Sequence, residues 1–350
     1  MGIYVNTFFE RMITLELCLI SNIILDMRRN TTIDVFKMIC AVLVIAIHSD
    51  LFIDVNDLLY LNFTNGIARI AVPFFFVVSG YFFYDRVVRE RPVRPYLLKI
   101  LIFFLCFTLV DGLTYFLLNP ESVLADVWDF LHMVFLSGAR LKYWYMTSLL
   151  LALVIVIPFW KKKLIWPCLV AGILLYIVMM TSDSYFVLFH NVLPGKFYET
   201  VFTYCNVFHG PQAGISSSLM FVSLGALIHK YKPVYRTGLL ILVSVLFFAE
   251  LNVVQHTYFY GGRMYLMLIF LAPMIFMYCL EHPGKEFDTS YFSDWCLLVY
   301  MTHHYVVYAL MDIGITGSLN FLITAITIVP LNYFIARMIR DRKKKKQVTA

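Results

Sequence analysis

Apolar residues in this chain gather into long, continuous runs that short polar stretches separate. Ten of these runs predict helices that cross a bilayer, for which about 20 mostly apolar residues are needed, or fewer among neighbouring helices. The runs are Ile33–Phe52, Gly66–Tyr84, Tyr96–Leu118, Tyr143–Trp160, Leu164–Met180, Ile215–Ile228, Leu239–Val254, Met264–Leu280, Trp295–Leu310 and Ser318–Ile335. Because they are continuous rather than alternating, they exclude a closed β-barrel. The pattern predicts an all-α, polytopic transmembrane bundle of about ten helices.

Composition agrees with this pattern. Of the 350 residues, 61% are hydrophobic and 14% are charged, and the mean hydropathy is +0.78. Soluble domains have roughly 45–50% apolar and about 25% charged residues, so the chain is not a soluble globular protein, a disordered chain or a disulfide scaffold. Its seven cysteines include no CxxC pair and most lie in apolar runs. They are best interpreted as small buried hydrophobes.

The distribution of basic residues predicts the orientation in the membrane. Most of the 28 lysines and arginines fall in connections on one side of the bundle. These connections are Arg28–Arg29, Arg86–Lys99, Lys161–Lys163, Lys230–Arg236, Lys285 and Arg337–Lys346. The positive-inside rule then predicts that both termini are cytoplasmic, in a multi-pass protein of the cell membrane. Because the charges lie in short runs between apolar segments, no nucleic-acid partner is expected.

The pattern divides the chain into three parts. Residues 1–26 are expected to form an extension or amphipathic segment, because the run Met12–Leu25 spans only about 21 Å as a helix, short of a core of about 30 Å. Residues 27–340 form the transmembrane domain, and residues 341–350 a basic cytoplasmic tail. The long outer loops Asn119–Lys142 and Thr181–Gly214 are the places for structure outside the membrane.

Ionisable residues inside the first run are candidates for a functional site, because a charge in the bilayer costs several kcal/mol unless it faces a cavity or a partner. Lys37 and His48 are eleven residues apart. On a helix they point the same way, separated by about 16 Å along the axis. The alternative is that Lys37 snorkels to the surface and His48 makes an interhelical hydrogen bond.

The second run contains a basic residue ahead of a proline. Arg69 lies one turn before Pro73, and helices broken within a bilayer are tolerated where they line a cavity. Further along, Ser79-Gly80 allows another helix to approach closely, and structure alone could explain this pair.

Four features together resemble the acyltransferase-3 family of membrane O-acyltransferases. They are a basic residue eleven positions before a histidine (Lys37 and His48), the sequence VPFFFVVSGYFF from Val72, the aromatic motif Leu141–Met146, and Tyr300-x-x-His303. The resemblance covers about residues 28–337, and Ala68–Phe82 is most similar to the membrane half of VanT-type serine racemases. Two departures stand out. Lys37 replaces the usual arginine and lacks its bidentate fork, and the chain ends soon after Lys343–Lys346, so no racemase domain is expected.

The resemblance implies transfer of an acyl group, most often acetyl, from cytoplasmic acyl-CoA to a hydroxyl of an envelope glycan or lipid-linked sugar. His48 would act as the general base or as a transient acyl carrier, and Arg69 would neutralise oxyanion charge or orient His48. Lys37 would join the basic residues that hold the CoA phosphates. The alternative is that these basic residues only set the orientation of the helices in the membrane. The donor-binding candidates are Arg86, Arg89, Arg91, Arg94 and Lys37. The substrate-binding candidates are Asp34, Ser79, Trp144, Tyr145, Glu250, Tyr300 and His303.

A second hypothesis stays open. An amino-acid permeation module needs a cation for the carboxylate of serine and an acceptor for its ammonium group. Arg69 or Lys37 could provide the cation, and the acceptor candidates are Asp34, Asp50, Asp111 and Glu250. A non-catalytic, partner-binding membrane protein is a weaker third hypothesis. The expected partners are the lipid bilayer, acyl-CoA and a hydroxylated acceptor, and a homo-oligomer is left open.

His303 and His304 are adjacent in the sequence. Neighbouring residues on a helix point about 100° apart, so His303 is assigned to the site and His304 to packing or to an interface. No metal site is expected, because these histidines lack an i, i+4 partner and a third nearby ligand.

Overall fold

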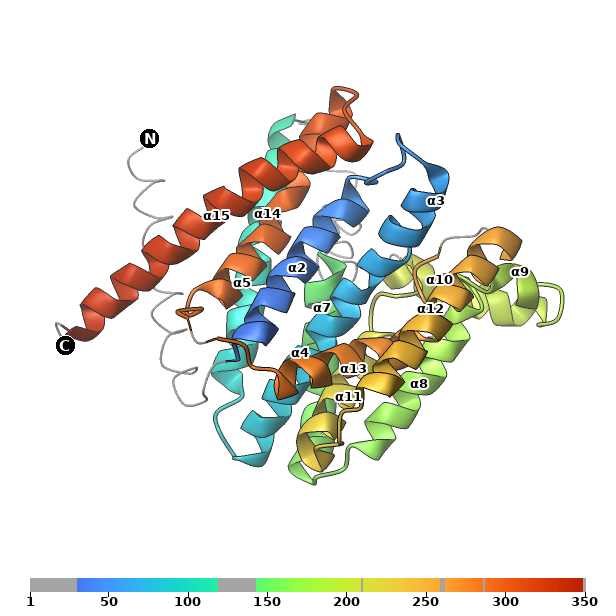
Figure 1. Ribbon diagram of the computed structural model, residues 1–350. Coiled ribbons are helices and arrows are strands. Elements are labelled where there is room, and N and C mark those ends of the chain that lie inside the picture. The colour runs from blue at the N-terminus through green and yellow to red at the C-terminus, as the bar shows by residue number, and fades with distance from the viewer. Residues whose placement is uncertain (1–29, 119–142, 209, 259–261, 286, 349–350) are drawn as a thin grey trace.

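The computed structural model describes residues 30–118, 143–208, 210–258, 262–285 and 287–348. Within these ranges the chain forms helices and no strands, which confirms the all-α expectation. The N-terminal segment 1–26 and the outer loop Asn119–Lys142 lie outside the described residues. In Figure 1, α2 lies near the centre of the bundle, with α15 along one flank and α8 and α12 on the other.

Each of the ten expected runs contains a helix. The helices are α2 (Thr31–His48), α4 (Ala71–Val88), α5 (Arg94–Leu118), α7 (Trp144–Lys161), α8 (Trp166–Met180), α11 (Ser218–Tyr231), α12 (Thr237–Tyr258), α13 (Leu268–Glu281), α14 (Phe292–Asp312) and α15 (Gly317–Val348). Among the described residues, six helical stretches are long and apolar enough to cross a membrane. They are Thr31–His48, Asp57–Val88, Arg94–Gly112, Trp144–Lys161, Thr237–Gln255 and Gly317–Arg342. The chain is therefore a multi-pass membrane protein.

Short irregular elements lead into α4. They are α3 (Asp57–Leu59), a π-helical turn η1 (Tyr60–Thr64) and a 3₁₀ turn η2 (Ile67–Ile70). Pro73 falls in the first turn of α4, where the missing N–H has no intrahelical acceptor to lose. The irregular backbone therefore precedes the proline. Two further helices, α9 (Phe186–Phe189) and α10 (Gly195–Phe208), occupy the expected outer loop Thr181–Gly214.

Two glycines allow α4 and α11 to pack backbone to backbone. A Cβ atom added at Gly80 would collide with the Val222 carbonyl oxygen, and one added at Gly225 would collide with the Val77 carbonyl oxygen. The close approach is thus reciprocal. This confirms the structural interpretation of Ser79-Gly80, because small residues at helix interfaces let backbones come together in a bilayer.

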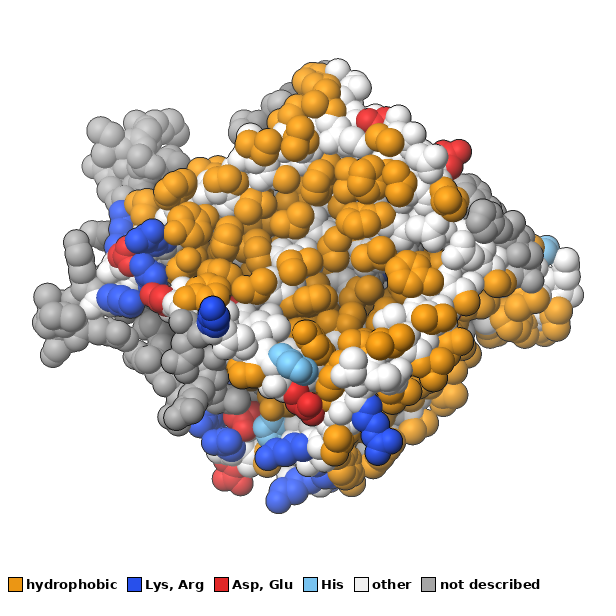
Figure 2. Space-filling model, in the orientation of Figure 1, with side chains coloured by type: hydrophobic (Ala, Val, Ile, Leu, Met, Phe, Trp, Pro, Cys, Tyr) orange, Lys and Arg blue, Asp and Glu red, His pale blue; other side chains and the backbone are white. Residues whose placement is uncertain are grey.

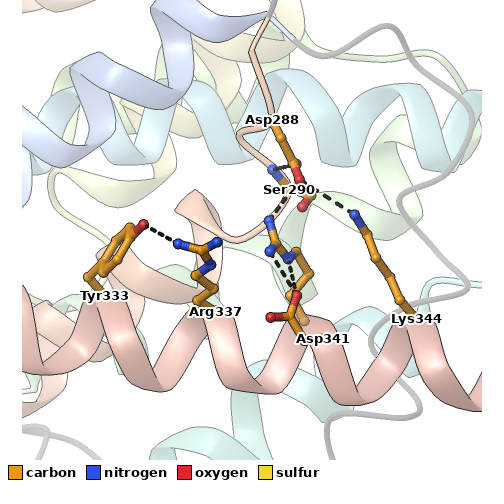
Figure 3. Close-up of polar contacts among 7 residues, drawn as sticks. Asp288, Ser290, Tyr333, Arg337, Asp341 and Lys344 are labelled. Carbon is orange, nitrogen blue, oxygen red and sulfur yellow. Dashed lines mark hydrogen bonds and ion pairs between the residues drawn. The ribbon is translucent and has the colours of Figure 1, made fainter.

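Polar contacts tie the basic connections together at one end of the bundle. The Lys230 ammonium group donates to the Lys163 carbonyl oxygen at 3.1 Å. Asp288, before α14, forms ion pairs with Arg340 at 2.7 Å and with Lys344 at 3.5 Å on α15 (Figure 3). Figure 2 shows apolar side chains over the broad face of the molecule, with lysines and arginines toward its left and lower margins.

Loops join the helices at the opposite end. The backbone N–H of Gly317 donates to the Ser49 carbonyl oxygen at 2.9 Å, which links the start of α15 to the end of α2. Asp54 accepts hydrogen bonds from the Ser318 N–H at 2.9 Å and from its hydroxyl at 2.8 Å. These bonds hold the pKa of the Asp54 carboxyl below its usual value, and they cap α15.

Candidate functional site

Three histidines from two helices come together inside the bundle. His48 is the last residue of α2, and His303 and His304 lie in the middle of α14. The His48 ring centroid is 5.3 Å from that of His303 and 4.4 Å from that of His304. His303 and His304 are fully buried, whereas His48 is partly exposed. We call these three residues the histidine cluster.

His304, which the sequence assigned to packing or to an interface, lies beside His48. Its ring lies closer to His48 than that of His303 does, and the two neighbouring rings are 3.8 Å apart. His303 and His304 leave α14 in different directions. Because the end of α2 lies between these two directions, both imidazole rings reach His48. A third histidine does therefore join the tandem pair, contrary to the expectation from spacing.

Aromatic side chains of α7 and α14 surround the histidine cluster. The Tyr143 hydroxyl donates to the Met301 carbonyl oxygen at 3.1 Å, and its ring is 5.9 Å from that of His304. Tyr145 lies edge-on to Tyr300 at 5.4 Å. The structure thus brings the predicted residues Tyr145, Tyr300 and His303 together with His48.

Two members of this arrangement were missed from the sequence. Tyr143 lies within the aromatic motif, but the motif by itself did not separate it from Trp144, which is half-buried at the start of α7. His304 was dismissed on helical geometry. Ser79, on α4, lies near the Tyr145 hydroxyl.

The hydrogen bond made by His303 fixes its tautomer. Its Nδ1 atom lies 3.1 Å from the Val299 carbonyl oxygen, and a carbonyl can only accept, so Nδ1 carries the proton. The Nε2 atom then has a lone pair. Among the described residues it is buried and has no hydrogen-bond partner. His303 is therefore a neutral imidazole with an unused acceptor.

Lys37 lies on the same face of α2 as His48, as the spacing predicts, since both residues face α14. Its ammonium group is 2.6 Å from the Asp34 carboxylate and donates to the Ser293 hydroxyl at 2.9 Å. Thr289 donates to Asp34 at 2.6 Å. Lys37 therefore belongs to a paired polar group at the basic end of α2, about 16 Å from His48 along the helix.

Arg69 lies in a different group, at the other end of the bundle. Its guanidinium donates to the Asn65 side chain at 2.6 Å, and its Nε atom is buried without a hydrogen-bond partner among the described residues. The structure gives Lys37, His48 and Arg69 three different sets of neighbours, and their membership of one site stays a prediction.

Glu250, on α12, accepts hydrogen bonds from the backbone just before α13. Its carboxylate accepts the Leu266 N–H at 2.5 Å, the Met267 N–H at 2.8 Å and the Tyr185 hydroxyl. These contacts give the half-buried carboxylate on α12 its partners within the protein. A role for Glu250 in substrate binding stays a prediction.

The predicted donor-binding arginines lie at the turn between α4 and α5. Arg86 donates to the Pro92 carbonyl oxygen at 3.1 Å and covers the Tyr96 ring at 5.7 Å. Arg89 forms an ion pair at 2.7 Å with Asp85, which also contacts His229. Part of the positive charge at this turn is therefore neutralised within the protein. Arg91 lies in the turn itself, and Arg94 begins α5.

The fold and this buried cluster define a multi-pass membrane protein with a polar centre between its helices. A model of the acyltransferase domain matches residues 30–337 of the chain. The chain therefore belongs to the acyltransferase-3 family, which confirms the resemblance.

Relatives include an amino-acid racemase of Enterococcus faecalis, 24% identical over 92% of this chain and 47% of the relative. A serine/alanine racemase of Enterococcus gallinarum is 28% identical over 80% of this chain and 41% of the relative. The chain thus spans less than half the length of these relatives. No solved structure matches it.

Proposed function

We propose that this chain is a membrane O-acyltransferase that moves an acyl group, acetyl in the simplest case, from cytoplasmic acyl-CoA to a hydroxyl of an envelope glycan or lipid-linked sugar. The observation that carries the proposal is the histidine cluster, in which His48 meets His303 inside an aromatic wall, in a chain of the acyltransferase-3 family. Acyl transfer to an alcohol needs a base near neutral pKa, and an imidazole supplies it.

The proposed reaction has one nucleophilic step. The acceptor oxygen attacks the thioester carbonyl carbon while His48 takes the hydroxyl proton. The C–O bond forms, the C–S bond breaks, and the departing thiolate of CoA receives the proton from His48. Hydrogen-bond donors near the thioester oxygen would stabilise the developing oxyanion, and we assign this role to Arg69.

The orientation of the helices supports entry of the donor from the cytoplasm. We infer ten spans with both termini in the cytoplasm of a cell-membrane protein. Two observations support this: the basic connections meet at one end of the bundle, and the loops at the other end carry few cations. Lys37 lies at the basic end of α2 and His48 at the other end. A donor would thus bind with its phosphates near Lys37 and Arg86 and reach inward with its thioester.

Transfer by the purified protein tests the proposal. The full chain in lipid nanodiscs is supplied with radiolabelled acetyl-CoA and a lipid-linked sugar extract, and both labelled acceptor and free CoA thiol are measured. The expected result is equal formation of the two products in the wild type and neither in His48→Ala. His190→Ala, at an exposed histidine, serves as the matched control and should keep full transfer. An inactive wild type that is folded and supplied with acceptor contradicts the proposal.

Permeation of an amino acid is the second candidate, and the similarity to two amino-acid racemases favours it. The Asp34–Lys37 pair offers both charges that a zwitterion requires. Counterflow of labelled serine into proteoliposomes separates the two candidates. Serine-dependent exchange without release of CoA thiol would support permeation, whereas CoA release without exchange supports acyl transfer.

A further inference from the structure

The histidine cluster has the composition of a transition-metal site. The three residues each offer one ring nitrogen, and these nitrogens all lie within 4.8 Å of one another. Neutral imidazole is a ligand that suits Zn²⁺, Cu²⁺ and Ni²⁺. Three protein ligands with an open fourth position are the arrangement found in catalytic zinc sites.

The tautomer of His303 is the one that metal ligation needs. Ligating histidines donate their other ring N–H to a carboxylate, a carbonyl or water, which fixes the ring and points the lone pair at the ion. His303 does this through Nδ1, which donates to the Val299 carbonyl oxygen at 3.1 Å. Its Nε2 is buried without a hydrogen-bond partner among the described residues, so an ion would satisfy a buried acceptor that the protein leaves unused.

The geometry requires only small side-chain movements. With Zn–N bonds of about 2.0–2.1 Å, tetrahedral ligands lie about 3.3 Å apart. The ligand nitrogens all lie within 4.8 Å of one another, so binding an ion requires them to approach by at most about 1.5 Å. His48 is partly exposed, which gives an ion a route to the two buried histidines.

We propose that His48, His303 and His304 bind one divalent transition-metal ion of the Zn²⁺ type. A bound ion occupies the lone pair of His48. Since the proposed function uses the same lone pair as a base, metal binding and acyl transfer exclude one another at this cluster. This consequence rests on the proposed function, whereas the binding itself does not.

Direct metal binding tests the proposal. The full chain is purified through a tag without histidines, stripped with a chelator in detergent, and titrated with Zn²⁺ by calorimetry and with Co²⁺ by visible absorption. We expect one ion per chain and ligand-field bands of a nitrogen-coordinated Co²⁺. Loss of an outer-shell partner alone weakens metal binding by about 10–100-fold, so His303→Gln and His304→Gln should each weaken it by more than about 100-fold.

The control removes two histidines outside the cluster. The double variant His190→Ala/His282→Ala changes two exposed residues and should bind as the wild type does. Size-exclusion profiles show whether the glutamine variants fold. The proposal is overturned if the folded wild type does not bind one ion per chain. It is also overturned if the control variant loses metal binding while the glutamine variants keep it.

A final measurement separates the binding from its consequence. CoA release is compared in metal-free protein and in protein loaded with one Zn²⁺ per chain. We expect loss of release on loading and recovery after chelation. Undiminished CoA release from the loaded protein would overturn the mutual exclusion but not the metal binding. A wild type that binds Zn²⁺ but never releases CoA would contradict the proposed function and not the metal binding.

Discussion

The His48 imidazole at the end of α2 lies 4.4 Å, centroid to centroid, from that of His304 in the middle of α14. Eleven residues earlier on α2, Lys37 contacts Ser293 near the start of α14 at 2.9 Å. The two helices therefore pack side by side in the same direction, and one face of α14 meets both polar residues of α2. This relationship links a charged group at the basic end of the bundle to a histidine cluster deeper within it.

Replacing His48 by alanine should abolish transfer. A positioned general base typically contributes about 10²–10⁴-fold to the rate, so we expect a loss of at least about 100-fold in transfer with donor affinity and expression largely kept. Transfer is measured with labelled acetyl-CoA, and His282→Ala at an exposed position is the control. Full transfer by His48→Ala would show that the histidine is structural.

Replacing Lys37 should affect both stability and donor binding. Lys37→Ala leaves the largely buried Asp34 carboxylate without its cation, and breaking a buried pair typically costs about 3–5 kcal/mol. The double variant Asp34→Asn/Lys37→Met removes both charges and should recover most of that stability in thermal unfolding.

The same variants separate the pair's structural role from donor binding. Donor affinity should stay weak in the double variant, because the cation near the CoA phosphates is still missing. Lys37→Arg should bind and transfer normally, since the family pattern carries arginine there. Normal donor affinity in the double variant would restrict Lys37 to a structural role.

Replacing Arg69 by alanine should lower turnover without an equal loss of donor affinity. The guanidinium is assigned to the oxyanion of the transition state, and an interaction made only there changes kcat rather than KM. Initial rates over a range of acetyl-CoA concentrations separate the two constants. A variant that loses affinity and keeps turnover would assign Arg69 to ground-state binding.

Adding a methyl group at Gly80 should destabilise the contact between α4 and α11. The new Cβ would collide with the Val222 carbonyl oxygen, and overpacking typically costs about 1–3 kcal/mol. Gly238→Ala is the matched control, because nothing lies within 4 Å of a Cβ there, and it should gain about 0.4–1 kcal/mol. Equal thermal stability of the two variants would contradict the close packing.

The ion pairs of Asp288 should give a small, pH-dependent stabilisation. Hydrogen bonds from Ser290, together with Lys344 and Arg340, lower the pKa of Asp288 from its usual 3.8 to about 2. The stabilisation is therefore complete above about pH 4 and is lost as the pH falls through about 2. Because the carboxylate is half exposed, Asp288→Asn should cost less than about 1 kcal/mol at pH 7.

Thermal unfolding at pH 7 and pH 3 checks this dependence. The difference between wild type and Asp288→Asn should be smaller at pH 3, whereas Asp312→Asn, at an exposed carboxylate, should show little difference at pH 7. A difference that grows on acidification would contradict the direction of the pKa shift.

Labelling of introduced cysteines tests the orientation of the bundle. An impermeant maleimide added to intact cells should reach Val192→Cys and Ile313→Cys but not Val234→Cys, although all three positions are highly exposed in the structure. Labelling of Val234→Cys should appear only after the membrane is opened. The opposite pattern would place the termini outside the cell.

Local pattern determined a large part of this molecule. The apolar runs predicted ten membrane-crossing helices. The structure has a helix in each run, and six helical stretches among the described residues are long and apolar enough to cross a membrane. The eleven-residue spacing placed Lys37 and His48 on one face of α2. Both follow from the 3.6-residue period and from the cost of polar groups in a bilayer, which act within one segment. The motifs also identified the acyltransferase-3 family.

Tertiary structure alone decided which residues meet. The sequence assigned His304 to packing or to an interface and named Glu250 as a substrate candidate. Only the structure shows that the His304 ring lies 4.4 Å from that of His48 and that Glu250 accepts from backbone N–H groups before α13. Helical periodicity gives the direction in which a side chain leaves its own helix. It carries no information on how the neighbouring helix is rotated or where it crosses, because those depend on side-chain packing between segments far apart in the chain. The histidine cluster exists only because α2 crosses α14 at the boundary between two of its faces.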